Sequence, residues 1–142
     1  MKRFLLRLVK YIWALPNSIL GVILGLAVLC LGGRARFLSG ALEFYGGLFE
    51  RLIKKAPAFF RFEAVTLGHV IIGINKAQLE SGREHEHVHI RQYERWGPFF
   101  LPAYAISSFW QIARRRRSYR DNIFEREAYA SEDNAKEQQR SV

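Results

Sequence analysis

The first third of the chain is dominated by one long apolar run. Tyr11–Gly33 comprises 23 residues without a charged side chain and is rich in leucine, isoleucine and valine. As a helix it would be about 35 Å long, enough to cross a hydrocarbon core of about 30 Å. We predict that residues 1–33 form a basic segment and a transmembrane helix, in which Pro16 introduces a kink or divides the helix into two pieces. Basic residues flank the run: Lys2, Arg3, Arg7 and Lys10 before it, Arg34 and Arg36 after it.

A cleaved signal peptide is the alternative for the same segment. Its basic start and apolar centre fit a signal peptide, but the apolar run is long and has no A-x-A-type cleavage site. Cys30 follows Leu29 rather than a small residue, which also fits a lipoprotein cleavage site poorly. With one cysteine in the chain, an internal disulfide is excluded.

Two later segments have the composition of β-strands. Phe37–Tyr45 and Phe60–Ile74 are rich in aromatic and β-branched residues and are punctuated by glycine. We predict two or three strands here, joined by a basic segment that contains Arg51, Lys54, Lys55 and Pro57. His69 falls in the second segment. We expect it to be a histidine satisfied by hydrogen bonds at a strand end, with contact to a substrate or an oxyanion as the alternative.

The polar segment that follows contains an H-E-x-x-H motif, His85 to His89, inside a predicted helix of about four turns. Ser81 and Glu84 are spaced as a capping box, and Gly97-Pro98 predicts that the helix ends at Trp96. Histidines four residues apart lie on one helical face and can bind the same metal ion.

The residues of this helix divide into three roles. His85 and His89 are the candidate ligands, since zinc accepts imidazole nitrogen readily, and Glu86 is the candidate general base for a bound water. Gln92 lies on the same face and could orient a ligand or the substrate without binding the metal itself. His87 points away from this face and is not expected to take part in the site.

A third ligand is expected from a second helix further along the chain. Asn122 can cap that helix, whose first turns hold Glu125 and Glu127. These two carboxylates point in directions about 200° apart, so only one should face the metal. The geometry of the helix alone leaves open which of the two it is.

H-E-x-x-H followed by the E-x-x-A of Glu125 to Ala128 resembles the gluzincin arrangement of zinc metallopeptidases. The resemblance implies a zincin-like fold, zinc as the cofactor and Glu125 as the third ligand. It also implies that a strand before the motif helix, here in Thr66–Ile74, holds an extended peptide substrate. Many gluzincins carry aspartate four residues after the ligand glutamate, and this chain has Tyr129 there. Tyr129 lies one turn from Glu125 and could donate its hydroxyl to an oxyanion.

The run from Glu86 to Pro98 also resembles an uncharacterised family of small bacterial proteins with a hydrophobic N-terminus. The likeness extends over most of the chain, through Leu15-Pro16-Asn17, Thr66-Leu67-Gly68-His69 and Asn122-Ile123-Phe124-Glu125. It implies a location at the bacterial inner membrane, and it brings no established activity.

The basic residues cluster beside apolar segments. The chain has a formal net charge of +9 at pH 7. Phe99–Ala113 is apolar, too short to span a bilayer, and runs directly into Arg114–Arg117, which predicts a buried or interfacial helix with a basic end. No nucleic-acid-binding motif accompanies the charge, so anionic phospholipid is the expected partner. Residues 133–142 are polar and are expected to be disordered.

Together these patterns predict an α+β fold, with an N-terminal transmembrane helix followed by a small zincin-like domain in residues 34–132. That domain would contain two or three strands, the motif helix and one or two further helices. The expected function is that of a single-pass, membrane-anchored zinc metallopeptidase-like hydrolase acting on a peptide or protein substrate. Four basic residues precede the apolar run against two just after it, which favours a cytoplasmic N-terminus, although later basic residues leave the orientation open. The oligomeric state is open as well.

Two hypotheses from other classes remain. In the first, the protein is non-catalytic and membrane-associated, and its histidines bind a metal ion or nothing. In the second, it is a lipid-binding adaptor that uses the arginine cluster and is indifferent to the histidines. A site with no open coordination position, or one with Glu125 far from both histidines, would indicate the non-catalytic protein. Vesicle binding that falls with salt would indicate the adaptor.

Overall fold

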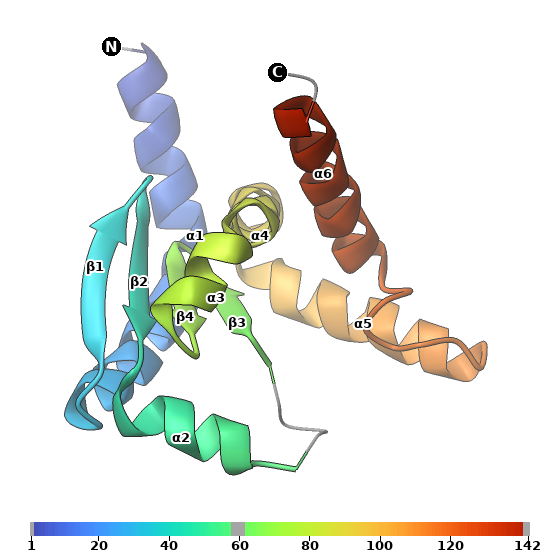
Figure 1. Cartoon of the computed structure of the whole chain (residues 1–142). Coiled ribbons are helices and arrows are strands. Elements are labelled where there is room, and N and C mark those ends of the chain that lie inside the picture. Colours follow the sequence, from blue (N-terminus) through green and yellow to red (C-terminus); the bar gives the residue numbers. More distant parts are fainter. Residues whose placement is uncertain (1, 58–61, 141–142) are drawn as a thin grey trace.

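The computed structural model describes residues 2–57 and 62–140, and has a mixed α+β architecture (Figure 1). A four-stranded sheet carries helices on both faces, and a group of helices extends from one side of it (Figure 1). The described elements, in chain order, are α1 (Lys2–Cys30), β1 (Arg34–Leu38), β2 (Ala41–Tyr45), α2 (Gly47–Lys55), β3 (Ala64–Leu67), β4 (Val70–Gly73), α3 (Lys76–Ser81), α4 (Arg83–Trp96), the 3-10 helix η2 (Gly97–Phe99), α5 (Phe100–Ala113) and α6 (Ile123–Arg140).

The sheet has the strand order β1-β2-β4-β3, with β2 and β4 parallel at its centre. β1 and β2 form an antiparallel hairpin, whose two-residue turn, Ser39-Gly40, has positive φ angles of 52° and 85°. β3 and β4 form a second antiparallel hairpin. The segment between the hairpins, expected to be a plain connection, contains α2. The expected start of the second strand region at Phe60 lies outside the described residues.

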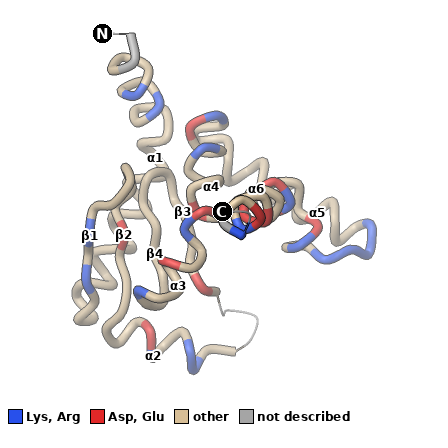
Figure 2. The backbone as a smooth tube through the Cα atoms, turned by 45° about the horizontal axis from the view of Figure 1, so that its top comes forward, with Lys and Arg blue, Asp and Glu red and all other residues tan. Residues whose placement is uncertain are grey.

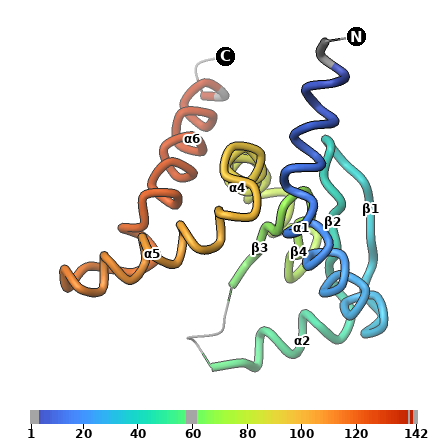
Figure 3. Tube along the Cα trace, turned by 180° about the vertical axis from the view of Figure 1, so that it is seen from behind, coloured from blue at the N-terminus to red at the C-terminus, as the bar shows by residue number. Residues whose placement is uncertain are grey.

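Side chains alternate between the two faces of the sheet and build two separate clusters. Phe44, Val70 and Ile72 pack with Val28 of α1 on one face. Ala41 and Ile71 pack on the other face with Leu79 of α3 and Ile90 of α4. The sheet is therefore a middle layer between α1 and the α3–α4 pair, and it fixes where α4 lies (Figures 1 and 3).

The apolar run forms one continuous helix that passes through Pro16 without dividing. α1 is long and apolar enough to cross a membrane, but one of its sides packs against the sheet. The contact is close because small residues form it: a Cβ added at Gly25 would lie 2.3 Å from the Phe44 ring, and one at Gly21 would lie 2.7 Å from Val70 Cβ. α1 is thus part of the folded domain as well as a long apolar helix.

The motif helix ends where expected but begins differently. α4 ends at Trp96, and Gly97 follows with a φ of 56°. The predicted capping box is wrong, because α4 has Gly82 as its N-cap residue and the Ser81 hydroxyl donates to the Gln78 carbonyl. The side-chain cap belongs to α3, where Asn75 accepts from the Gln78 amide.

The last helix is longer than expected. Asn122 caps α6 as predicted, its Oδ1 accepting from the Phe124 amide at 3.0 Å. The polar segment predicted to be disordered is helical as far as Arg140. Lys136 pairs with Glu132 one turn away, and such pairs stabilise exposed helices that have little apolar surface to bury.

Packing of α1 on the sheet predicts a large effect of added volume at Gly25. We expect Gly25→Leu to cost about 3 kcal/mol and to lower Tm by roughly 5–10 °C, because no space exists beside Phe44. Leu26→Met, on the exposed side of the same helix, is the matched control. Equal thermal denaturation of the two variants in mild detergent would contradict the packing.

Candidate metal centre

Two helices bring three metal-ligating side chains together. His85 and His89 lie one turn apart on α4, and Glu125 lies in the first turn of α6, which packs against α4. The three residues are 7%, 8% and 3% exposed, so little solvent remains to hydrate them. Each offers one atom, and these atoms lie within 4.8 Å of one another. This is the set predicted from the motif, and it includes the glutamate that spacing alone left undecided.

The separations between the three donor groups are close to those around a bound metal ion. The two Nε2 atoms are 3.2 Å apart, His85 Nε2 is 3.1 Å from Glu125 Oε2, and His89 Nε2 is 3.4 Å from Glu125 Oε1. Bonds of about 2.0–2.1 Å to a tetrahedral zinc ion place neighbouring ligand atoms about 3.3 Å apart. The two histidines face different Glu125 oxygens, and with one oxygen taken as the ligand the three donor atoms lie within 4.8 Å of one another. Small side-chain shifts would bring them around a small divalent cation.

A neighbouring side chain fixes the proton on the far side of the His89 ring. His89 Nδ1 lies 2.9 Å from Gln92 Oε1, and the Gln92 amide nitrogen donates to the Phe124 carbonyl and to Glu127. Because the amide oxygen can only accept, His89 Nδ1 must be the donor. His85 Nδ1 is buried without a hydrogen-bond partner and lies 3.6 Å from a Glu132 oxygen, too far for a hydrogen bond. In neutral His89 the Nε2 lone pair then faces His85 Nε2 and the Glu125 carboxylate, an arrangement that a cation stabilises.

Glu86 is held beside this cluster by the sheet. It is 7% exposed, and the Thr66 hydroxyl of β3 donates to its Oε2 at 2.6 Å. Burial raises the pKa of the Glu86 carboxyl, and the Thr66 hydrogen bond and the nearby histidines oppose that rise. A buried carboxyl with a raised pKa and one fixed oxygen suits a group that takes up and returns a proton.

Glu125 receives hydrogen bonds that the sequence did not predict. The Tyr104 hydroxyl of α5 donates to Glu125 Oε1 at 2.7 Å. Burial alone would raise the Glu125 pKa, but hydrogen bonds from His85, His89 and Tyr104 hold it at about 2. The same contact, together with burial, raises the Tyr104 pKa and keeps its hydroxyl protonated. Glu125 is thus an anion across the ordinary pH range.

The remaining predicted site residues fall around this centre or away from it. Tyr129 packs its ring edge-on against His85, with ring centroids 4.7 Å apart, so it borders the site. Glu127 is partly exposed and accepts from Gln92 instead of joining the ligands. His87 also lies outside the ligand group, as expected.

His69 is engaged elsewhere. It lies in the β3–β4 turn, stacks on Tyr11 of α1 at 3.9 Å and lies 3.3 Å from Glu94 of α4. Its described partners connect α1 to α4. The expectation of a histidine satisfied by hydrogen bonds holds for Nε2 alone, because His69 Nδ1 is buried without a hydrogen-bond partner. None of these partners is one of the three candidate ligands.

Three contributors were missed in the sequence: Thr66, Tyr104 and Glu132. Glu132 lies on α6 seven residues after Glu125, two turns further on the same face, so helical spacing could have found it. Thr66 and Tyr104 approach from a strand and another helix, and no local pattern reports such contacts. Glu132 supplies a carboxylate near His85 where the gluzincin pattern would place an aspartate at position 129.

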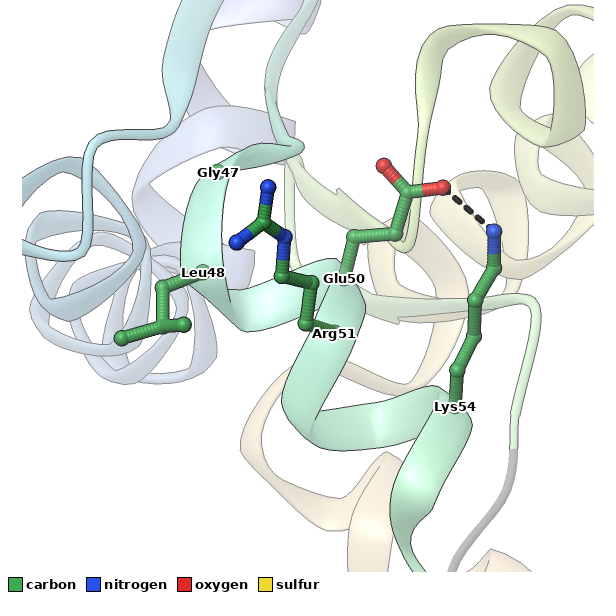
Figure 4. Close-up of a pocket in the computed structure, with 5 residues that line it drawn as sticks. All are labelled: Gly47, Leu48, Glu50, Arg51 and Lys54. Atoms are coloured by element: carbon green, nitrogen blue, oxygen red, sulfur yellow. Dashed lines mark hydrogen bonds and ion pairs between the residues drawn. The ribbon is translucent and has the colours of Figure 1, made fainter.

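A surface depression on α2 is separate from this centre. Gly47, Leu48 and Arg51 line it together with Glu50 and Lys54, which pair at 2.7 Å within the one helix (Figure 4). It shares no residue with the ligand group. Among the described residues it also contributes no second group of side chains that could hold a metal ion.

Comparison of the chain with protein-family models, with curated proteins and with solved structures gives no match.

The contact between Gln92 and His89 predicts a loss of metal affinity without loss of a ligand. We expect Gln92→Leu to weaken Zn²⁺ binding about 10- to 100-fold, because His89 loses the acceptor that fixes its tautomer. His87→Ala is the control on the same helix and should leave the affinity unchanged. Competition titration against a chromophoric chelator measures both, and equal affinities would show that Gln92 does not orient the ligand.

The stability of the metal-free protein should have a maximum in mildly acidic solution. The lowered Glu125 pKa gives stability that is present above about pH 4.5 and is lost as the pH falls toward 2. Burial alone would lower the His89 pKa, but Glu125 raises it, so this contribution is lost as the pH rises through that value. Chelator-treated protein should have its highest Tm above about pH 4.5 and below the raised His89 pKa. Glu125→Gln should flatten the pH dependence of Tm on both sides of that maximum. Unchanged slopes in that variant would contradict the pairing.

Proposed function

We propose that the protein is a membrane-attached, zinc-dependent hydrolase of the metallopeptidase type. One observation carries the proposal: two imidazole rings and a carboxylate converge, with one donor atom from each within 4.8 Å of the others, and the buried Glu86 lies next to His85 in the same helix. Three protein ligands of this kind leave a fourth position for water or substrate, which is the composition of catalytic zinc sites. The order H-E-x-x-H then E, together with the small buried Ala128, supports the gluzincin resemblance.

A bound zinc ion would supply Lewis acidity that lowers the pKa of a water molecule and polarises a carbonyl. Glu86 would accept a proton from that water as the water attacks an amide carbon. It would then return the proton to the leaving nitrogen as the carbon–nitrogen bond breaks. Thr66 keeps one Glu86 oxygen hydrogen-bonded, which leaves the other for the proton transfer. Tyr129, next to His85, is the candidate for stabilising the oxyanion.

The sheet supports a peptide as the substrate class. β3 is an edge strand: within the described part of the chain only β4 pairs with it. Thr66 on β3 touches Glu86, so a chain added along this edge would pass close to the general base. Strand addition provides backbone hydrogen bonds without requiring particular side chains. We expected Thr66–Ile74 to hold the substrate. Within that segment β3 lies at the edge of the sheet, whereas β4 is an inner strand and is already paired on both sides.

A non-catalytic metal-binding protein is the second candidate. The observation that favours it is burial: His85, His89, Glu125 and Glu86 are each less than 10% exposed. Structural metal sites are closed, whereas catalytic sites keep one position open. The two functions differ in what Glu86 contributes, because only the hydrolase needs its carboxylate.

Metal content and hydrolysis together test the proposal. Detergent-purified protein should carry near-stoichiometric zinc, and His85→Ala and Glu125→Ala should lose it. Glu86→Gln should retain zinc and lower kcat/KM on a quenched-fluorescence peptide library at least 100-fold, because the proton acceptor is gone.

Each other result has a defined meaning. Zinc in the wild type without Glu86-dependent cleavage would favour the non-catalytic alternative. No zinc after loading would overturn the metal site itself. Zinc lost in His85→Ala but kept in Glu125→Ala would move the third ligand away from Glu125.

A further inference from the structure

α1 has two chemically different sides along its whole length. On one side, residues three or four positions apart form an unbroken apolar stripe: Leu5, Leu8, Ile12, Leu15, Ile19, Ile23 and Leu26. These side chains are 46–60% exposed, although all are large and apolar. A continuous exposed stripe of this kind marks a surface that something else covers.

The opposite side of α1 faces the protein. Gly21 and Val28 pack on the sheet there, and Ala14 packs in a cluster with Tyr93, Phe100 and Phe124 of the other helices. Toward the N-terminus the same side continues with polar contacts: Asn17 donates to the Gly97 carbonyl, and Lys10 donates to Glu94 of α4 at 2.7 Å. α1 is therefore amphipathic in the folded protein, although its sequence reads as uniformly apolar.

A helix held in this way is poorly placed to cross a bilayer. Only residues 4–13 form an uninterrupted run of exposed residues, a length of about 15 Å against a hydrocarbon core of about 30 Å. The rest of α1 lies alongside the sheet. Crossing would carry into hydrocarbon the open sheet edges and the charged Arg34 and Arg36 of β1. Unpaired backbone groups and charges are not tolerated there.

Charge around the stripe matches an anionic surface. The first 42 residues contain six Lys or Arg and no Asp or Glu, and the first acid, Glu43, is fully buried and paired with Arg36. Figure 2 shows basic positions and no acidic ones along α1. Where α1 meets η2, Trp13 packs near Phe99, and α5 leads from there to exposed Phe109 and Trp110.

We propose that the outer stripe of α1 lies in the plane of an anionic phospholipid bilayer, so that the protein attaches to one leaflet and does not span the membrane. Apolar side chains would enter the acyl region, and the flanking cations would meet lipid phosphates. This inference deepens the membrane attachment in the proposed function. It is independent of the metal chemistry, and replaces the expected single-pass anchor with a one-sided one.

Topology distinguishes the two arrangements. In a Cys30→Ser background, one cysteine is placed in a short tag before Met1 and another, in a separate protein, at exposed Lys76 on α3. Sealed spheroplasts and inverted membrane vesicles are then treated with a membrane-impermeant maleimide. One-sided attachment predicts that both positions are labelled from the same side. Labelling from opposite sides would overturn the proposal.

Vesicle binding tests which surface is used. Purified protein diluted from detergent should bind vesicles containing about 30 mol% anionic phospholipid, and binding should weaken with salt. Ile19→Asp with Ile23→Asp should reduce binding at least tenfold, since two apolar anchors are lost. Ile123→Asp on α6, an equally exposed isoleucine across α4 from α1, is the matched control and should bind as the wild type (Figure 1).

Two results would overturn the proposed surface. The first is equal binding by the stripe variant and the control. The second is a wild type that ignores vesicles and forms a dimer that Ile19→Asp with Ile23→Asp dissociates, because a second copy would then cover the stripe. Zinc content of the same variants should be unchanged, which separates failure of this inference from failure of the metal site.

Discussion

The structure is organised around three buried acceptor groups that face one another. His85, His89 and Glu125 are brought within 3.1–3.4 Å, with the far side of His89 already hydrogen-bonded. Without a cation, the metal-free protein must place a proton among them, which is why the Glu125 pKa is low and the His89 pKa is raised. The packing of α4 on α6 concentrates acceptors where a metal can replace that proton.

The rest of the fold holds this pair of helices in place. The sheet supports α4 through Ile71 and Ile90, and presents Thr66 to Glu86 from its edge strand. α1 closes the other face of the sheet and reaches α4 through Lys10 and Glu94. A single apolar helix thus completes the core on one side and leaves a continuous apolar surface on the other. Both features follow from one sequence, because small residues recur on the side that meets the sheet.

The ligand set could be predicted from sequence because helical spacing and a short motif specify it. His85, His89 and Gln92 follow from four- and three-residue steps, and the resemblance to gluzincins selected Glu125 over Glu127. Thr66 and Tyr104 could not be predicted, since their contacts depend on how separate elements pack. The mixed α+β class was correct, but four strands formed where two or three were expected, because the turn residues Ser39-Gly40 and Gly68-His69 each close a hairpin. Hydropathy alone did not reveal that α1 is amphipathic, as glycine and alanine count as apolar whichever side they occupy.

X-ray absorption at the zinc edge, on protein loaded with one equivalent of zinc, tests the convergence of the three donors most directly. We predict a four-coordinate spectrum with nitrogen and oxygen at about 2.0–2.1 Å and multiple scattering from two imidazole rings. His85→Ala should remove one of those ring contributions. A six-coordinate oxygen shell without imidazole scattering, the same in wild type and variant, would contradict a metal centre built by α4 and α6.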